Sequence, residues 1–377
     1  MTATLKKLLT TATASYCAAA AACTTFTVLP EASETGNMLL HKCRDRKIVG
    51  RLFANIQSGE NGVRWMQVGY DGRATFAMSS RGVAMTSNTG NELDIRGIRI
   101  PKRKNVWTFD RIMEEAPTAD AGVPLIKKRW RAKFGGIYMI ADAKKAFLVE
   151  IGSNYGEHME IPGGLTVVAN AMHLPGIEYR SVASADRVVK QRTREANTRA
   201  ALRRTRNRDG KYTRRGMFAV SRIICGSKPV DHNVFRKTSL TAVCFELDPE
   251  FPAQLSTAYI ALGPQRHTVY LPCPMALKQF PEPFRDGSWA KRALELRQKL
   301  GEENPMLPRI VALEDKMLEE YDRTRAEARE LLREGRHAEA EKLLTDLFAR
   351  HFAAADKLLN ASEKTNADAY SYRGSCF

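Results

Sequence analysis

The stretch CTTFTVLPEASETGNMLLHKCRDRK, residues 23–47, decides the fold of the chain. Residues 24–29 are rich in β-branched and aromatic side chains, which predicts a strand. The segment EASETGN carries Gly36 and Asn37 and predicts a hairpin turn. MLLHKCRD then predicts a second strand that ends at Asp45. A hairpin of this kind brings Asp45 back beside Cys23.

The leader before Cys23 has the layout of a secretory signal peptide, residues 1–22. Two early lysines precede an uncharged run and then small residues, with Ala20 and Ala22 in an A-x-A arrangement. Cleavage after Ala22 would leave Cys23 as the N-terminus of a secreted or periplasmic protein. Two alternatives stay open: an ordinary amphipathic first segment, and lipoprotein processing that attaches a lipid to Cys23 and anchors the protein to a membrane.

An N-terminal cysteine would combine a nucleophile and a base in one residue. Its α-amine has an ordinary pKa of about 8 and can accept the proton of the thiol. A carboxylate is needed to hold the amine, and Asp45 is placed for that role. Lys42 or Arg44 could supply a cation near the carbonyl group under attack. The alternative is that KCRD is only the charged end of a strand.

These residues resemble the cysteine branch of the N-terminal nucleophile (Ntn) hydrolases. That branch contains the penicillin V acylases, the bile salt hydrolases, the acyl-CoA:6-aminopenicillanic acid acyltransferases and related secreted dipeptidases. After processing, its members begin with C-T-x, pass a glycine turn, and end the hairpin in R-N-x-D or K-N-R-D. Cys23 matches the nucleophile of that pattern and Asp45 its carboxylate. Lys42 stands where several members carry arginine, and Cys43 replaces the usual asparagine.

Later segments extend the resemblance over residues 23–275. SSRGVAMTSNTGN is similar to a strand and turn that line the family's site, with Asn88 as the best candidate residue and Thr89 and Asn91 as weaker ones. GGLTVVANAMHLPG is similar to the segment that supplies the oxyanion-hole amide, which implies that role for Asn170. An asparagine at the end of a strand is also a common turn former.

Arg44 and two further residues are candidates for substrate binding. His173 directly follows the Asn170 segment, and it is either a residue of the substrate pocket or a structural one. Arg236 matches loosely the basic residue that some members of the family place near the site.

The resemblance implies an α+β fold, a four-layer αββα sandwich over residues 23–285, with a C-terminal helical extension, 286–377, packed on it. It implies an amidohydrolase that cleaves a linear amide through an acyl-enzyme, and an acyltransferase if an amine replaces water. The substrate would be a small-molecule amide or a short peptide. The alternatives are a dipeptidase of the same superfamily and a non-catalytic protein, either lipidated or basic and binding anions or nucleic acid.

The net charge of +17 is concentrated between Arg187 and Arg215, in a segment that predicts a helix followed by a turn at NRDG. Such a charge run attracts anions. It lacks interleaved aromatic residues and a nucleic-acid motif, so a solvated helix is the favoured interpretation. From Trp289 to about Leu359 the pattern predicts an amphipathic helix pair broken at Gly335, which packs on its own domain or forms a dimer face.

No cofactor or metal is expected. The seven cysteines show no CxxC pair, and the seven histidines are scattered without ligand spacing. Most of the cysteines are expected to be small buried side chains, with one or two disulfides left open. No run of about 18 apolar residues occurs beyond residue 25, so no membrane-spanning helix is expected there.

Overall fold

The structure is a computed structural model that describes residues 23–46, 50–94, 108–128, 134–152, 155–224 and 234–363. The expected leader, 1–22, and residues 364–377 lie outside the described residues, as do Cys17, Cys225 and Cys376.

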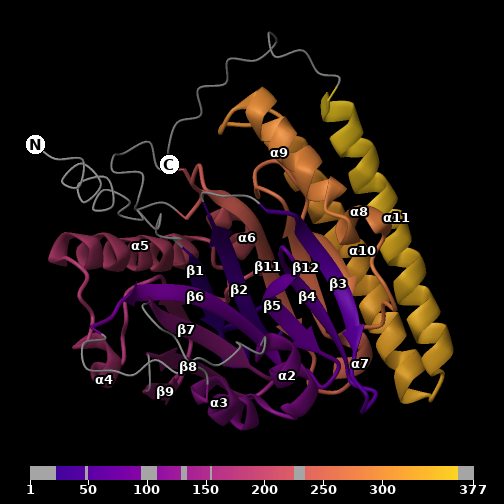
Figure 1. The fold of residues 1–377 in the computed structure, drawn as a ribbon. Helices are drawn as coiled ribbons and strands as arrows, with labels where there is room; N and C mark the ends of the chain where they lie inside the picture. Colours follow the sequence, from indigo (N-terminus) through magenta and orange to yellow (C-terminus); the bar gives the residue numbers. More distant parts are fainter. Residues whose placement is uncertain are drawn as a thin grey trace, which may run out of the picture.

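Two antiparallel sheets form the centre of the molecule (Figure 1). The first sheet has six strands in the order β10 (Leu165–Val168), β1 (Thr24–Val28), β2 (Met38–Asp45), β11 (Ser239–Leu247), β12 (Thr257–Leu262) and β13 (Leu271–Pro274). The predicted hairpin is therefore the pair β1–β2, and it lies inside the first sheet with a partner strand on each side.

The second sheet has seven strands that pair in chain order. They are β3 (Leu52–Ser58), β4 (Arg64–Tyr70), β5 (Arg73–Ser79), β6 (Ala84–Glu92), β7 (Phe134–Ala141), β8 (Ala146–Ile151) and β9 (Gly156–Glu160). Consecutive antiparallel strands need only short connections, and several of the turns carry a glycine with positive φ, such as Gly62, Gly72 and Gly82.

Helices cover the outer face of each sheet. Over the first sheet lie α5 (Ala185–Arg204), α6 (Arg214–Ser221), α10 (Leu307–Arg333) and α11 (His337–Glu363). Over the second sheet lie α2 (Thr108–Glu115) and α3 (Ala119–Lys127). The shorter helices are α4 (Pro175–Glu178), α7 (Pro252–Leu255), α8 (Glu282–Arg285) and the 3-10 helix η1 (Pro30–Ala32).

Three buried clusters show that the layers are stacked. Leu40 and Phe245 of the first sheet share one cluster with Met78 and Met139 of the second, so these faces pack against each other. Phe26 belongs to a second cluster with side chains of α5, α10 and α11. A third cluster joins the other face of the second sheet to α2 and α3. The predicted α+β sandwich of four layers, αββα, is confirmed.

The C-terminal region differs from the predicted helix pair in having three helices. A first helix, α9 (Ser288–Leu300), ends at Gly301, and α10 and α11 then form the antiparallel pair about Gly335 (Figure 1). Both glycines have positive φ, 74° and 78°. The break between α9 and α10, at Gly301, was not predicted.

A buried ion cluster joins α10 to the first sheet. Arg325 of α10 pairs with Glu246 of β11 and, at 2.9 Å, with Asp248. Glu246 is fully buried and also accepts hydrogen bonds from Asn37 and Tyr259 at 2.8 Å and 2.7 Å. Every charge in the cluster thus has a partner. None of the described helices has the length and apolar character needed to cross a membrane.

Candidate active site

Cys23 lies at the open end of the β1–β2 hairpin. Thr24 pairs with Cys43 in the register of the two strands, which sets Cys23 level with Arg44. Side chains alternate along a strand, and Leu40 lies in the cluster between the sheets while Leu39 and Cys43 lie in the helix-side cluster. Lys42 and Arg44 therefore share the inter-sheet face with Leu40. The side chain of Cys23 is fully buried.

Two cations lie close to the thiol of Cys23. Nη1 of Arg44 donates to Sγ of Cys23 at 3.5 Å, and the charge of Lys42 also acts on the thiol. Burial acts to raise the pKa of the thiol, but the charges of Lys42 and Arg44 and the backbone N–H of Asp45 outweigh burial. The pKa of Cys23 is lowered as a result, which favours a nucleophilic thiolate. Arg44, predicted as a substrate-binding residue, thus contacts the thiol itself.

Lys42 is held by a residue of the opposite sheet. Its Nζ donates to Oδ1 of Asn88 on β6, and the hydroxyl of Thr25 donates to the same oxygen at 3.0 Å. Burial and the neighbouring Arg44 charge lower the pKa of Lys42 to about 8, although the thiol opposes this shift. Lys42 therefore remains mainly protonated at neutral pH.

Asn88 uses both ends of its amide within the protein. Its Nδ2 donates to the backbone oxygens of Val168 at 3.3 Å and Ala169 at 2.5 Å. It is predicted as a catalytic residue, but this geometry gives it a positioning role: it fixes Lys42 on one side and the segment leading to Asn170 on the other.

Asp45 has one occupied and one open carboxylate oxygen. Oδ1 accepts a hydrogen bond of 2.6 Å from the hydroxyl of Ser239. Oδ2 lies 3.9 Å from Nε of Arg236 and, among the described residues, accepts no hydrogen bond. Burial raises the pKa of this carboxyl, while Arg236 and Ser239 counteract the rise. Asp45 thus presents a buried acceptor next to Cys23, and Arg236 lies near the site, as predicted from the family pattern.

Asn170 follows β10 and is oriented from both sides. Its Nδ2 donates to the backbone oxygen of Thr89 at 2.7 Å, and its Oδ1 accepts from Nη2 of Arg194 at 3.0 Å. Of the two weaker candidates, Thr89 contributes this backbone oxygen. The other, Asn91, accepts a hydrogen bond from Gln191 at 2.9 Å.

Arg194 is a residue of this site that the sequence interpretation missed. It lies in the charge run assigned to a solvated helix, yet its side chain is only 1% exposed. The signal was present as a spacing, because Gln191, Arg194, Thr198 and Leu202 recur at helical intervals and are all buried. The inner face of α5 is thus polar, which hides it from a search for apolar periodicity.

His173 lies between two carboxylates. Its Nδ1 lies 3.3 Å from Glu150 and its Nε2 3.1 Å from Glu195. Burial acts to lower the pKa of the imidazole, but hydrogen bonds to the two carboxylates raise it to about 9. Glu195 also accepts from the backbone N–H of Ala169 at 2.8 Å. His173 therefore links α5 to the segment that carries Asn170.

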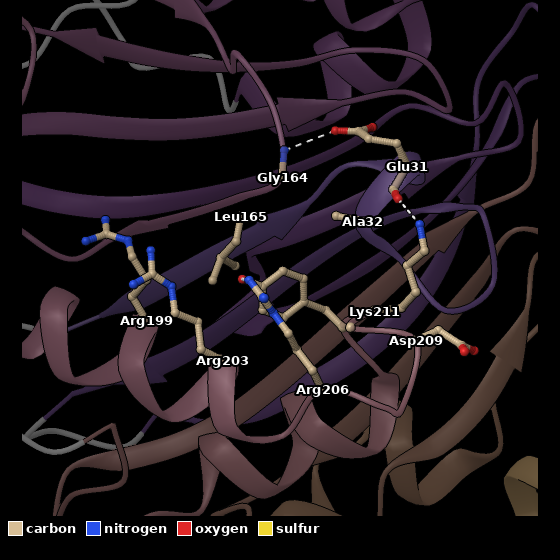
Figure 2. Close-up of a pocket in the computed structure, with 11 residues that line it drawn as sticks. Glu31, Ala32, Gly164, Leu165, Arg199, Arg203, Arg206, Asp209 and Lys211 are labelled. Carbon is tan, nitrogen blue, oxygen red and sulfur yellow. Dashed lines mark hydrogen bonds between the residues drawn. The ribbon is translucent and has the colours of Figure 1, made fainter.

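The outward-facing part of the basic segment lines a groove away from Cys23 (Figure 2). The groove, of about 370 Å³, lies beyond the far end of β1, at Glu31 and Ala32. Its basic residues are Arg199, Arg203, Arg206 and Lys211. The guanidinium of Arg206 stacks on the ring of Tyr212 at 4.5 Å. The charge run is thus divided between the site and this surface.

Four of the cysteines are described, Cys23, Cys43, Cys244 and Cys273, and all four are buried free thiols. Within the described part of the chain, no group of three or more His, Cys, Asp or Glu side chains is arranged to hold a metal ion.

Comparison with protein-family models and with curated protein sequences gives no match. Among solved structures, two mutant forms of the conjugated bile acid hydrolase from Clostridium perfringens are similar to this chain. The first has 10% identity and a TM-score of 0.39, and the match covers 63% of this chain and 88% of the hydrolase. The second has 11% identity and a TM-score of 0.39, with coverage of 67% and 92%. The function has to be argued from the geometry of the site.

Proposed function

We propose that the chain is the precursor of an amidohydrolase in which Cys23, freed as the N-terminal residue, is the nucleophile. The observation that carries this proposal is the surroundings of Cys23. A buried thiol with a lowered pKa lies beside Arg44 and Lys42, and the neighbouring Asp45 keeps an open carboxylate oxygen. That oxygen suits the α-ammonium group that cleavage before Cys23 would create.

The reaction follows from these positions. The α-amine of Cys23 accepts the thiol proton, and the sulfur forms a bond to the amide carbon. The resulting oxyanion is stabilised by the cation of Lys42 and an amide N–H of Asn170. The C–N bond then breaks as the ammonium returns its proton to the leaving amine. Water, deprotonated by the same α-amine, attacks the thioester and releases the acid and the free thiol. Asp45 holds the amine throughout.

The finer identity of the reaction depends on what reaches the thioester. An acylase releases an acid to water, an acyltransferase passes the acyl group to a second amine, and a dipeptidase releases free amino acids. We favour hydrolysis of an N-acyl compound over the other two reactions. The cations at Cys23 act on the carbonyl group of the substrate, and this action does not require the substrate to have a free N-terminus.

Secretion after cleavage between Ala22 and Cys23 is part of the proposal. Burial of Cys23 and its contact with Arg44 argue against the lipoprotein alternative, because a sulfur that carries a lipid could not keep this position.

The decisive experiment is intact-mass analysis and N-terminal sequencing of the protein exported by its own leader. We expect a chain that begins at an unmodified Cys23 and hydrolyses members of an N-acyl amide panel. Cys23→Ala should abolish turnover, and Asp45→Asn should reduce it by about 100-fold or more. Cys273→Ala, which replaces another buried thiol, is the matched control and should retain activity. A lipid on Cys23, or full turnover by Cys23→Ala, would refute the proposal.

A further inference from the structure

Positive charge exceeds negative charge around Cys23. Lys42 and Arg44 act on the thiol, and Arg194 and Arg236 act on Asp45. Asp45 is the carboxylate that acts on the thiol. Glu195 also acts on Arg194, so with Cys23 ionised the cluster would hold four cations against three anions if each carried its full charge. A buried cluster with an excess of positive charge attracts an anion.

Arg194 carries buried hydrogen-bond donors that an anion would satisfy. Its Nη2 donates to Asn170, but its Nε and Nη1 have no hydrogen-bond partner within the described structure. Burial and the like charge of Arg236 lower the pKa of Arg194 to about 10, while Asp45 and the thiol oppose this shift. A single hydrogen bond to a neutral amide does not compensate for the burial of a guanidinium group, because leaving its other N–H donors unpaired is costly.

The position of Arg194 brings these unpaired donors close to the proposed catalytic residues. Arg194 contacts Asn170, the proposed oxyanion-hole residue, and lies within electrostatic range of both Asp45 and the thiol of Cys23. Guanidinium groups bind carboxylates and other oxyanions with charge-assisted hydrogen bonds. A ligand group that reached Arg194 would therefore sit next to the carbonyl attacked by Cys23.

We propose that Arg194 is a substrate-binding residue and that the substrate carries a carboxylate or a similar oxyanion close to its scissile amide. This inference rests on the proposed function, because it assumes that Cys23 is the nucleophile. It narrows the substrate class to anionic N-acyl compounds or anionic acyl groups.

Two alkylating reagents test the proposal without knowledge of the substrate. Iodoacetate and iodoacetamide both transfer a two-carbon group to a thiolate with loss of iodide, but only iodoacetate carries a carboxylate. Their rates are measured at Cys23 by mass spectrometry, on protein that begins at Cys23. Because both reagents report on the same thiolate, the ratio of the two rates cancels any change in the fraction ionised.

We expect the iodoacetate-to-iodoacetamide ratio at Cys23 to exceed that of a free cysteine derivative by about 10-fold, as one charge-assisted contact implies. Arg194→Gln, which keeps an amide donor for Asn170, should return the ratio most of the way to the free value. Arg194→Lys should keep part of the preference. Arg203→Gln is the matched control, since it removes an exposed arginine from the same helix, and it should not change the ratio.

Each contrary outcome is distinct. A fast iodoacetamide reaction with the ratio of free cysteine overturns the anion site and leaves the nucleophile intact. A raised ratio that survives Arg194→Gln overturns the role of Arg194. Slow alkylation of Cys23 by both reagents overturns the proposed function and this inference together. If Arg194→Gln does not fold, wild-type protein still decides the matter: acetate, and not acetamide, should slow the iodoacetamide reaction at constant ionic strength.

Discussion

Lys42 is the residue whose charge does most to offset the effect of burial on the thiol. Replacing it with methionine removes that charge while keeping much of the side-chain volume. We expect Lys42→Met to raise the pKa of Cys23, so that the pH profile of alkylation by iodoacetamide moves to higher pH. The measurement is the alkylation rate at Cys23 from pH 6 to 10.

The control for Lys42 is Lys145→Met, because Lys145 is exposed and pairs with Glu160 on the surface. Its profile should coincide with that of the wild type. An unchanged profile for Lys42→Met would mean that Arg44 and the backbone of Asp45 alone hold the thiolate.

At the residue scale, the sequence predicted those site residues that one hairpin brings together. Strand pairing is local, so the hairpin turn could place Cys23, Lys42 and Asp45 near one another. Arg194 and Ser239 reach the site through the packing of α5 and of β11, and pairing rules within the hairpin contain no information about either. Asn88 was identified by family resemblance, but its positioning role depends on contacts with backbone oxygens that no motif records.

At the element scale, the ion cluster that joins α10 to the first sheet should dominate the stability of the C-terminal helices. Arg325→Met removes one arginine from each of the buried carboxylates of Glu246 and Asp248, which keep Arg214 and Arg329 as their remaining partners. We expect a loss of about 3 kcal/mol in the free energy of unfolding, because breaking buried ion pairs leaves the remaining charges only partly compensated. Urea denaturation followed by circular dichroism measures the change.

The same helix supplies the control. Arg333 pairs with Glu250, but its side chain is 50% exposed, against 8% for Arg325. Arg333→Met should therefore cost far less than Arg325→Met. Equal losses for the two variants would show that the position along α10, rather than burial of the charges, determines the effect.

The accuracy of the predicted element boundaries depended on the strength of the local sequence signal. Gly335 was recognised as a break because it interrupts a long amphipathic pattern. The break after α9 was missed although GEENP, residues 301–305, contains the glycine and the proline that signal a helix end. A glycine with positive φ, Gly301, ends α9 there, and Gly335, also with positive φ, lies between α10 and α11.

At the scale of the whole molecule, His173 should make stability depend on pH. The pKa of its imidazole is about 9 in the folded protein, above the ordinary value of 6.5. A raised folded-state pKa stabilises the protein fully below about pH 6.5, and this contribution is lost as the pH rises through 9. We expect His173→Gln to flatten the decline in unfolding free energy across that window, by about 3 kcal/mol.

Chemical denaturation at pH 6 to 10 provides the measurement. His337→Gln, at the exposed start of α11, is the control and should keep the decline of the wild type. A His173→Gln curve parallel to the wild-type curve would contradict the raised pKa.

The four-layer arrangement was predicted from the resemblance of the motifs, whereas local patterns predicted only the strands and helices. Strand alternation does not say which of two buried faces meets a helix and which meets another sheet. β2 is buried along its whole length, so its pattern of burial is uniform. Only the order of the strands, with β2 between β1 and β11, explains why both of its faces are covered.

In that central strand, the residues HKCR alternate between two faces that have different roles. The even-numbered residues, Lys42 and Arg44, serve the thiol, and the odd-numbered residues, His41 and Cys43, pack toward the helices: His41 stacks on Phe26 and Cys43 lies in the helix-side cluster. The length of the turn at 30–37 fixes the register of β2 and so determines which of these residues face the thiol. Shortening the turn by a single residue would exchange the two faces of β2. An imidazole and a second thiol would then lie where the cations now lie. The length of an otherwise permissive surface turn is therefore as much a part of the chemistry as the nucleophile.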